Sequence, residues 1–406
     1  MEHVQVHQNT CVFTDIPINE TWCTKNPSPN DTHKSNDSQN LSYSSYHQVC
    51  YSCHFVAINL FDKEGPEENV YSTGFLVVYV LGGFSIFIGA CGLLTNILNV
   101  IVLRTRPCCG PSLTALLIPL AFCDFLTNLG ISCSIGAGLM MHGKISRGFE
   151  VQAVNYYLGS VAFLAQEASV CITLLISVER YFVVLKPLHA KRMFSVRKTK
   201  LFCAIVVGIV LLLHAPRWFE TRWRKIEPAE RIPPLEGFPY ILEFTPFGHF
   251  YYEKIGHVYF ILNYMFPIVI LFIVNLLLYR GIKASSKERR RLSISSITNS
   301  DTSCPLQNEV TAALMFRWVV IVLILCQVVP ILVGLIITLK RVAYREFGYF
   351  NVICLNVNAA VNIIIYCAFG KSFRSAYFSV LKGMWWRNSQ KYPMSTFSRR
   401  TSTVQT

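Results

Sequence analysis

The sequence predicts an all-α membrane protein, a bundle of seven transmembrane helices with a short amphipathic helix after the seventh. Of the 406 residues, 52% are hydrophobic and only 15% are charged, which is too apolar for an ordinary soluble domain. Crossing the ~30 Å hydrocarbon core of a bilayer takes roughly 20 helical residues. Apolar runs of at least that length occur at about 73–103, 112–140, 151–184, 199–218, 256–281, 310–339 and 347–369.

These runs divide the chain into four parts. Residues 73–370 form the seven-helix domain, and the segment before it, 1–72, is polar and lacks a long apolar stretch. After the seventh run, residues 371–387 place apolar side chains at helical spacing among basic ones, which is typical of an amphipathic helix lying on the inner leaflet. The last part, 388–406, is expected to be a disordered cytoplasmic tail.

Glycosylation signals and charge predict how the chain crosses the membrane. The Asn-x-Ser/Thr acceptor sequences all precede the first run, at Asn19, Asn30, Asn36 and Asn40. They favour a glycosylated N-terminal segment outside the cell, and seven crossings then put the C-terminus inside. The inner loops and tail so assigned carry more than half of the 37 Lys and Arg residues, in agreement with the positive-inside rule. This basic face suits anionic lipid and an acidic partner rather than nucleic acid, and we expect a multi-pass protein of the plasma membrane.

One motif lies at the inner end of the third run, where Glu179-Arg180-Tyr181 is followed, after a short gap, by Pro187. A charge at this depth must reach the interface, neutralise itself or serve a partner, because it is costly in hydrocarbon. The plain alternative is an Arg that snorkels to the headgroups. The motif resembles the inner end of the third span of rhodopsin-like G-protein-coupled receptors, whose general pattern covers about 73–385. The resemblance implies that Glu179, Arg180, Tyr181 and Pro187 act in coupling to a heterotrimeric G protein.

Other runs carry polar residues where a helix crosses the middle of the membrane. Asp124 ends the sequence Leu-Ala-Phe-Cys-Asp, which matches the Leu-Ala-x-x-Asp of the same receptor family. A buried carboxylate is costly unless a cation, a proton or a ring of donors compensates it. Ser169 lies eleven residues before Arg180, three helical turns away on one face. Asn358 and Asn362 are four residues apart and are expected to face one way.

In the receptors that the chain resembles, the corresponding polar residues bind a sodium ion. The resemblance therefore implies that Asp124, Ser169, Asn358 and Asn362 surround a structural sodium ion, with no other cofactor. Hard oxygen ligands around one carboxylate suit a small hard cation, so the chemistry agrees. The alternative is a polar packing cluster without an ion.

A narrower resemblance is to the FMRFamide-type neuropeptide receptors of invertebrates. It rests on the sequence Asn-x-Ile-Ile-Tyr-Cys-Ala-Phe-Gly-Lys-x-Phe-Arg that begins at Asn362, where most relatives have Asn-Pro. It also rests on Cys-Gln before Pro330, with Gln327 where most relatives have Trp, and on Asn275 eight residues after Pro267.

The proline pattern predicts where the helices bend. Pro267 and Pro330 each remove a backbone hydrogen bond and permit a kink in the fifth and sixth runs. In the seventh run Ile363 replaces the usual Pro, so a bend there is expected to come from Asn362 and the Asn one turn before it, competing for backbone groups. The resemblance makes Asn362 and Tyr366 parts of the activation switch. An ordinary interfacial Tyr is the alternative.

The chain departs from the family pattern at its outer face. The family usually ties the third span to the long outer loop by a disulfide, and Asn155 occupies the position of that cysteine. No cysteine occurs between 204 and 303 either, so we expect the outer loop to be held without this bond. The pairing of the cysteines before the first run stays open among three arrangements. These cysteines are Cys11, Cys23, Cys50 and Cys53.

Exclusion narrows the ligand class. Amine receptors of the family carry an Asp at the position of Ala162, and retinal proteins need a Lys in the seventh run, where 347–370 has none. A peptide remains, recognised by the outer loop 219–255 and by a pocket between the spans. A Glu inside the membrane, here Glu167, is a functional candidate, and its alternative is pairing with a polar neighbour such as His214. The expected pocket contains Ala162, Phe163, Gln166, Glu167 and Gln327.

These features predict a G-protein-coupled receptor for an extracellular, amidated, FMRFamide-like neuropeptide, with a heterotrimeric G protein and arrestin as inner partners. One alternative is a divergent receptor for a non-peptide ligand. Another is a transporter that uses Asp124 and Glu167 along an ion path, but the internal repeat that transporters show is not evident. No His-Glu-x-x-His, Gly-x-Ser-x-Gly or phosphate-binding loop points to an enzyme.

Overall fold

The computed structural model describes most of the helical body of the chain and parts of the segment 219–255. The described residues are 68–105, 109–143, 145–225, 239–255, 258–259, 261–295, 313–328, 331–332 and 345–391. The predicted glycosylation sites Asn19, Asn30, Asn36 and Asn40 lie outside the described residues, as do Pro330 and the four cysteines before the first run. The same holds for nearly all of the predicted segments 1–72 and 388–406.

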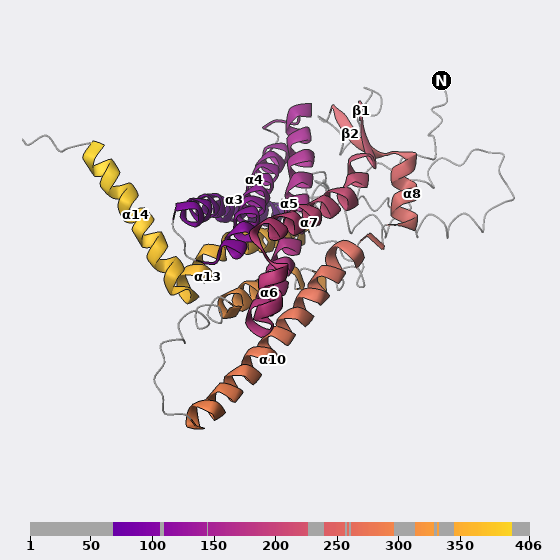
Figure 1. The fold of residues 1–406 in the computed structure, drawn as a ribbon. Coiled ribbons are helices and arrows are strands. Elements are labelled where there is room, and N and C mark those ends of the chain that lie inside the picture. Colours follow the sequence, from indigo (N-terminus) through magenta and orange to yellow (C-terminus); the bar gives the residue numbers. More distant parts are fainter. Residues whose placement is uncertain are drawn as a thin grey trace, which may run out of the picture.

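Helices dominate the described chain (Figure 1). The first half contains α3 (Glu68–Thr105), α4 (Pro111–His142), α5 (Phe149–Leu185), α6 (Pro187–Met193), α7 (Val196–His214) and the 3₁₀ turn η3 (Ala215–Trp218). The second half begins with β1 (Thr221–Lys225), β2 (Tyr240–Phe244), α8 (Pro246–Lys254), the π-helical turn η5 (Ile261–Met265) and α10 (Phe266–Ser295). It continues with the helix Ala313–Val328, α12 (Arg345–Ala360), α13 (Asn362–Phe369) and α14 (Lys371–Lys391).

The helices occupy the positions of the seven predicted spans. Within the described residues, five helices are long and apolar enough to cross a membrane, and the bent pair α12 and α13 passes the same test as one span. The sixth predicted span is represented by the shorter apolar helix Ala313–Val328. The predicted fold class is therefore confirmed. Several bounds differ by a few residues, and α10 continues furthest, beyond 281 to Ser295, while α14 continues beyond 387 to Lys391.

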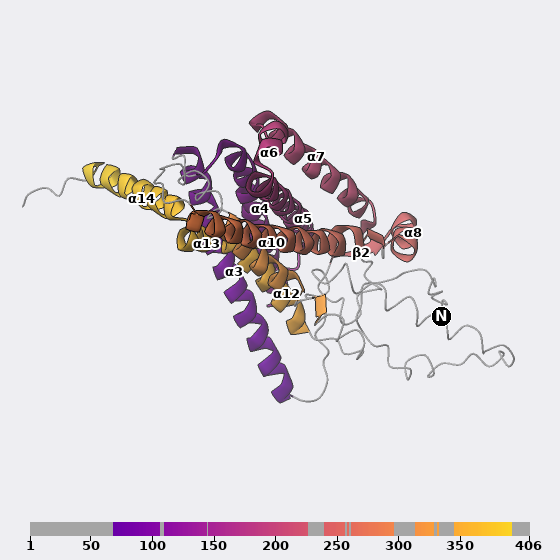
Figure 2. The same cartoon turned by 60° about the horizontal axis from the view of Figure 1, so that its bottom comes forward.

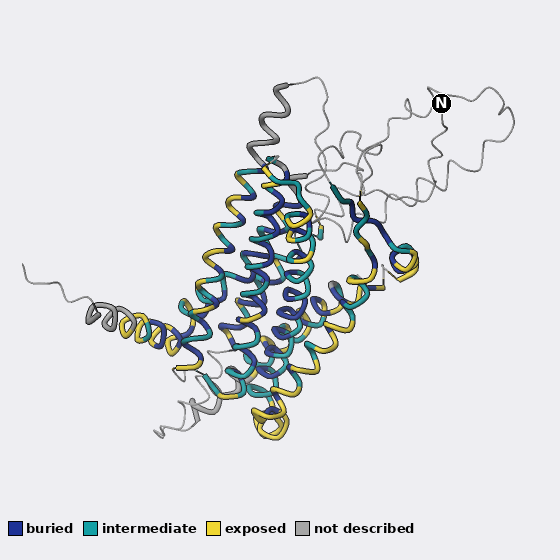
Figure 3. The backbone as a smooth tube through the Cα atoms, turned by 90° about the horizontal axis from the view of Figure 1, so that it is seen from above, coloured by how far each residue is buried: buried dark blue, intermediate teal, exposed yellow. Residues whose placement is uncertain are grey.

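The central element is α5, which packs against α4, α7 and α10, while α3 packs against α4 and α12 (Figure 2). Many apolar residues stay exposed, among them Phe87, Leu94 and Leu212. Buried stretches of the helices lie toward the inside of the bundle and exposed stretches on its outer faces (Figure 3). Exposed apolar surface on this scale would be a liability in water. It is the surface expected of helices that face lipid.

A small residue sets how closely α4 and α5 approach. A Cβ atom on Gly130 of α4 would lie 2.5 Å from the backbone oxygen of Leu158 and 2.8 Å from the Cβ of Ala162, both on α5. Small residues at such crossings let helix backbones come close enough for extensive van der Waals contact, which replaces the hydrophobic drive that is lacking in lipid.

The only described strands form an antiparallel hairpin, which the all-α prediction did not include. Thr221 pairs with Phe244 and Lys225 with Tyr240. The strand β2 is largely buried, since Ile241, Leu242 and Phe244 are each less than a tenth exposed. The hairpin lies at the end of the bundle where α5 begins, and α6 lies at the end where α5 stops. We call these the hairpin end and the α6 end.

The seventh span is broken although it lacks a proline. Its two halves, α12 and α13, meet at Val361 with a bend of 41°. The backbone oxygens beside the break accept hydrogen bonds from α3: Asn96 Nδ2 donates to Ala359 O at 2.8 Å and Thr95 Oγ1 to Ala360 O at 3.4 Å. The predicted bend is thus present, but its cause differs, because these carbonyls are satisfied by α3 and the Asn362 side chain bonds elsewhere.

The fifth span also departs from regular helix. Pro267 is the second residue of α10, two residues after the end of the π-helical turn η5. A proline has no N–H to donate to the carbonyl four residues earlier, and its ring clashes with that carbonyl. The wider turn accommodates this, and such turns are one of the recognised causes of helix bending.

The bond from Asn96 to the broken span gives a stability prediction. Asn96→Ala should lower the free energy of unfolding by about 1–3 kcal/mol, because the buried Ala359 oxygen loses its partner. Thermal unfolding of the protein in detergent measures the change. Ile97→Ala, which alters a 46% exposed side chain next in sequence, is the control and should have little effect. Equal melting temperatures for the two variants would contradict the assignment.

Candidate functional site

Asp124 joins three spans in the middle of the bundle. Its Oδ1 accepts a hydrogen bond from Ser169 Oγ of α5, and its Oδ2 accepts one from Asn362 Nδ2 of α13, each at 2.6 Å. The Asp124 side chain is 0% exposed, and it has no ion pair within the described residues. Two neutral donors therefore satisfy a fully desolvated carboxylate, and they couple α4, α5 and α13 at one point.

The fourth predicted member of this cluster is not brought to it. Asn358 is buried on α12, but in the described chain its side chain makes no hydrogen bond to Asp124. The four-residue spacing from Asn358 to Asn362 places both on one face only along a continuous helix. The break at Val361 interrupts that helix, so the two amides no longer share a partner.

The chemistry of the cluster suits a hard cation better than a transition metal. The described residues contain no group of three or more His, Cys, Asp or Glu side chains that could hold a metal ion. Asp124 and Ser169 offer hard oxygen atoms, which small hard cations prefer. Asn362 directs its amide nitrogen at Asp124 and would have to turn its oxygen inward to join a cation's ligands.

The motif residues at the α6 end are buried and paired. Arg180 is 3% exposed, and its guanidinium forms an ion pair with Glu179 Oε2 at 3.1 Å. Glu179 Oε1 accepts a further hydrogen bond from Ser112 Oγ of α4. At this exposure Arg180 does not snorkel to the headgroups, so that alternative is excluded. Tyr181 is half-buried next to the pair, and Pro187 is exposed as the first residue of α6.

Tyr366 connects α13 to its neighbours at the same end. It is buried, and its ring lies 5.9 Å from that of Phe316 and 5.2 Å from that of Phe373 on α14, measured between centroids. It is therefore packed between helices, which excludes an ordinary interfacial Tyr. A second link joins α10 to α5, where Asn275 Nδ2 donates to Ser177 Oγ at 3.1 Å.

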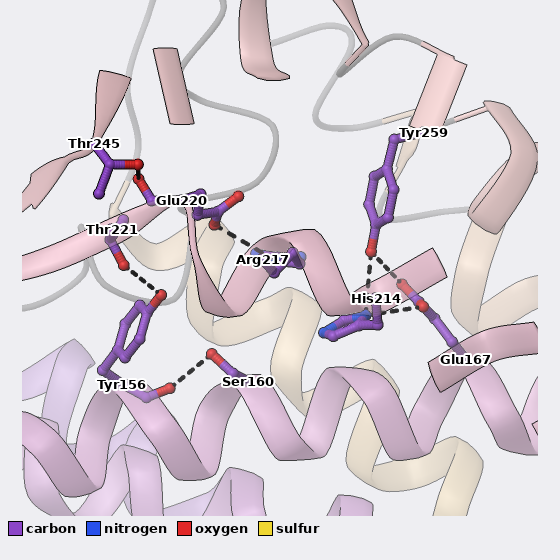
Figure 4. Close-up of polar contacts among 9 residues, drawn as sticks. All are labelled: Tyr156, Ser160, Glu167, His214, Arg217, Glu220, Thr221, Thr245 and Tyr259. Atoms are coloured by element: carbon purple, nitrogen blue, oxygen red, sulfur yellow. Dashed lines mark hydrogen bonds and ion pairs between the residues drawn. The ribbon is translucent and has the colours of Figure 1, made fainter. Parts of the chain in front are cut away.

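Toward the hairpin end, Glu167 belongs to a buried polar cluster (Figure 4). Glu167 Oε2 lies 3.1 Å from His214 Nδ1, and Tyr259 Oη lies 3.4 Å from Glu167 Oε1 and 3.1 Å from the same His214 nitrogen. Glu167 and His214 are 4% and 0% exposed. The structure thus shows the alternative interpretation of Glu167, a carboxylate paired with His214, and it joins α5, α7 and the residues before η5.

The other predicted pocket residues are spread over different surroundings. Ala162 packs in an apolar cluster with Val78 of α3 and Ile131 of α4, and Phe163 packs against the edge of that cluster. Gln166 and Gln327 are buried at 4% and 8% exposure. Ala162 and Phe163 thus belong to an apolar cluster, whereas Gln166 and Gln327 are buried polar residues outside it.

The hairpin is attached to α5 without a cysteine. Asn155, at the position of the expected disulfide, is buried and instead accepts hydrogen bonds from Ser134 Oγ of α4, at 2.8 Å to its backbone oxygen and 2.7 Å to its side-chain oxygen. The next residue, Tyr156, pairs its hydroxyl with Thr221 Oγ1 of β1 at 2.7 Å (Figure 4). Trp223 Nε1 of the hairpin donates to Tyr157 Oη at 3.1 Å. Hydrogen-bonded aromatic residues thus hold the hairpin to α5.

Charged residues of the hairpin neutralise one another. Glu243 on β2 is 5% exposed and pairs with Arg224, its diagonal neighbour, and with Arg222, its register partner, at 3.6 Å. Next to the hairpin, α8 packs through Tyr251, whose ring lies 6.0 Å from that of Tyr259. Burial raises the pKa of Tyr251 to about 12, so its hydroxyl stays neutral near physiological pH.

Several contacts were not anticipated from the sequence. Ser112 is the partner of Glu179, and Thr95 and Asn96 hold the broken span. Tyr377 of α14 donates to Asn99 of α3. The only signal for these residues is their polarity within or beside apolar runs, which indicates a hydrogen bond but does not identify its partner.

Comparison with known proteins yields one family. The profile described as "7 transmembrane receptor (rhodopsin family)" matches residues 95–366. The "FMRFamide receptor" of Drosophila melanogaster is 27% identical over 303 residues, which cover 73% of this chain and 52% of that protein. The "Probable G-protein coupled receptor 142" of Mus musculus is 29% identical over 120 residues, 29% of this chain and 32% of that protein. The chain thus spans about half the length of the fly relative and a third of the mouse one. Squid rhodopsin shares the fold, with a TM-score of 0.58 at 18% identity over 80% of this chain and 88% of that one.

The attachment of the hairpin gives a second prediction. Tyr156→Phe removes the hydroxyl bonded to Thr221 while keeping the ring, so amide hydrogen exchange of the two strands should become faster. Ser160→Ala is the matched control one turn away, because Ser160 bonds only to the backbone of its own helix. Unchanged exchange in the hairpin of the Tyr156→Phe variant would show that another contact fixes it.

Proposed function

We propose that this chain, which belongs to the rhodopsin family of seven-transmembrane receptors, is the receptor for an extracellular peptide of the amidated, FMRFamide-like class. The observation that carries the peptide assignment is the similarity to the fly FMRFamide receptor over 303 residues. The family consists of plasma-membrane receptors that couple to G proteins and are not enzymes. Membership of this family thus confirms the expectation that the chain is a multi-pass receptor and not an enzyme.

The orientation follows from charge. We assign the hairpin end to the outside and the α6 end to the cytoplasm, which puts the N-terminus outside and the C-terminus inside. The basic residues of α6 and of the start of α7 support this, since Lys and Arg gather on cytoplasmic loops. In this orientation α14 lies along the inner leaflet, with anionic lipid as its partner, and arrestin is a further partner at the same face.

The proposed mechanism begins with a closed cytoplasmic end. Arg180 is held by Glu179, which is held in turn by Ser112, so the guanidinium is not available to a G protein. A peptide that binds better to a second arrangement of the helices shifts the population toward it. The irregular turn before Pro267 in the fifth span is the proposed hinge, since regular hydrogen bonding is already interrupted there.

The connection between the two ends runs through buried polar contacts. Asp124 bonds to Ser169 of α5 and to Asn362 of α13, and Tyr366 lies one turn beyond Asn362 toward the α6 end. A shift of α5 or α13 therefore has to change the Asp124 bonds or carry them along. We assign Asn362 and Tyr366 to the switch that passes the movement to the cytoplasmic end.

Sodium is the proposed ion of the Asp124 cluster. Asp124 and Ser169 would supply oxygen ligands, Asn362 would supply its amide oxygen after turning, and Asn358 would join only if the break at Val361 adjusts. Bound there, the cation would compensate the buried carboxylate charge. What supports this is the complete burial of Asp124 without an ion-pair partner in the described chain.

The peptide assignment is tested with the full chain in lipid vesicles together with a heterotrimeric G protein. The peptide Phe-Met-Arg-Phe-amide should accelerate nucleotide exchange, whereas a biogenic amine and a scrambled amidated peptide should not. Activation by the amine alone, or by a lipid alone, would contradict a peptide ligand but leave the family assignment intact.

Arg180 provides the test of the mechanism. Arg180→Gln should keep peptide binding and lose peptide-stimulated nucleotide exchange, because it removes the cation proposed to meet the G protein. Arg192→Gln, a change in an exposed cation of α6, is the matched control and should retain exchange. If both variants couple normally, Arg180 serves only the stability of the bundle.

The sodium proposal has its own test. Sodium should change agonist affinity in the parent protein, and Asp124→Asn should abolish that effect, because the substitution removes the charge that attracts the cation. Potassium in place of sodium controls for ionic strength. Ser134→Ala controls for loss of a buried polar group on the same helix. A variant at Asp124 that keeps full sodium sensitivity would reject the site.

A further inference from the structure

The acidic side chains buried toward the hairpin end already have partners. Glu167 is paired with His214 and Tyr259, and Glu243 with Arg222 and Arg224. Glu220, which is 3% exposed, lies 3.8 Å from Arg217. A cationic group arriving from outside would have to displace one of these internal partners. The described buried carboxylates are therefore poor first contacts for a ligand.

Gln166 differs from these carboxylates. Its side chain is 4% exposed, yet among the described residues neither its Nε2 nor its Oε1 has a hydrogen-bond partner. A buried amide without a partner is costly, and native proteins retain such groups rarely. Both the donor and the acceptor of the amide therefore lack a partner in the part of the chain that the structure describes, and both can serve a bound ligand.

A second amide borders the same region. Gln166 lies one helical turn before Val170 on α5, and Gln327 lies one turn after Leu323 on the helix Ala313–Val328. Val170 and Leu323 pack together in one buried apolar cluster with Leu271 of α10. Because α5 runs away from the hairpin end and the sixth span runs toward it, both glutamines are on the hairpin side of this cluster. We call Gln166 and Gln327 the amide pair.

The chemistry of the amide pair selects a ligand group. A primary carboxamide offers one carbonyl oxygen and two N–H donors, so it can accept from Gln166 Nε2 and donate to Gln166 Oε1 at the same time. A carboxylate can only accept, so it would leave Oε1 unpaired and would bring a charge into a desolvated layer.

We infer that Gln166, with Gln327 on the same side of the apolar cluster, recognises the terminal carboxamide of an amidated peptide, whereas Glu167 keeps α5, α7 and the residues before η5 together. This inference rests on the proposed peptide function and adds to it the group that is recognised and the residue that recognises it.

The test compares Phe-Met-Arg-Phe-amide with its free acid on the parent protein and on Gln166→Leu. In the parent the amide should bind about 10- to 100-fold more tightly than the acid, the range for a site whose buried polar groups lose their partners. In Gln166→Leu this preference should nearly disappear, through loss of amide affinity. The control Gln152→Leu, a buried glutamine of α5 that donates to Arg147 O, should keep the preference.

A ligand-free measurement separates recognition from folding. Because the Gln166 side chain has no hydrogen-bond partner within the described chain, Gln166→Leu should raise the melting temperature of the empty protein, whereas loss of a structural hydrogen bond would lower it. If neither form of the peptide binds the parent, the proposed function fails and this inference fails with it. If the amide binds the parent and Gln166→Leu keeps the full preference for it, or the variant melts lower, the inference alone is overturned.

Discussion

The rest of the bundle depends on how the buried carboxylate of Asp124 is satisfied. Removing an ionised carboxylate from water costs roughly several kcal/mol even after the protein relaxes. The lipid around the bundle has no hydrogen-bond donors that could compensate this cost. Ser169 and Asn362 provide the compensating hydrogen bonds. These contacts fix α5 and the second half of the seventh span against α4. The helices therefore cannot slide independently, since each movement changes the partners of one carboxylate.

A chain of buried hydrogen bonds extends this constraint to the α6 end. Asn96 Nδ2 donates to Ala359 O beside the break in the seventh span, and Asn99 Nδ2 lies 3.4 Å from Asn96 Oδ1. Tyr377 of α14 then donates to Asn99 Oδ1. The ring of Tyr366 adds a packing contact to α14 through Phe373. The position of α14 is thus tied to the geometry of the broken span by two separate routes.

The sequence predicted the spans well, because a run of roughly twenty apolar residues in a membrane protein can form little other than a transmembrane helix. It also anticipated the meeting of Asp124, Ser169 and Asn362, which share the interior of the bundle. The spacing of Asn358 and Asn362 was a poorer guide, because it assumes an unbroken helix, whereas the bend expected in this span falls between the two residues at Val361. The hairpin was missed because its pairing depends on Tyr156 and Trp223 holding it against α5. Glu167 remained ambiguous until its distance to His214 was known.

The most direct test of the central role of Asp124 is a double-mutant cycle with Asp124→Asn and Ser169→Ala. Thermal or denaturant unfolding of the parent, both single variants and the double variant gives the interaction energy between the two side chains. A coupling of about 0.5–3 kcal/mol, the range for residues in direct contact, is expected. Additive effects, with a coupling near zero, would contradict the view that this carboxylate holds α4 and α5 together.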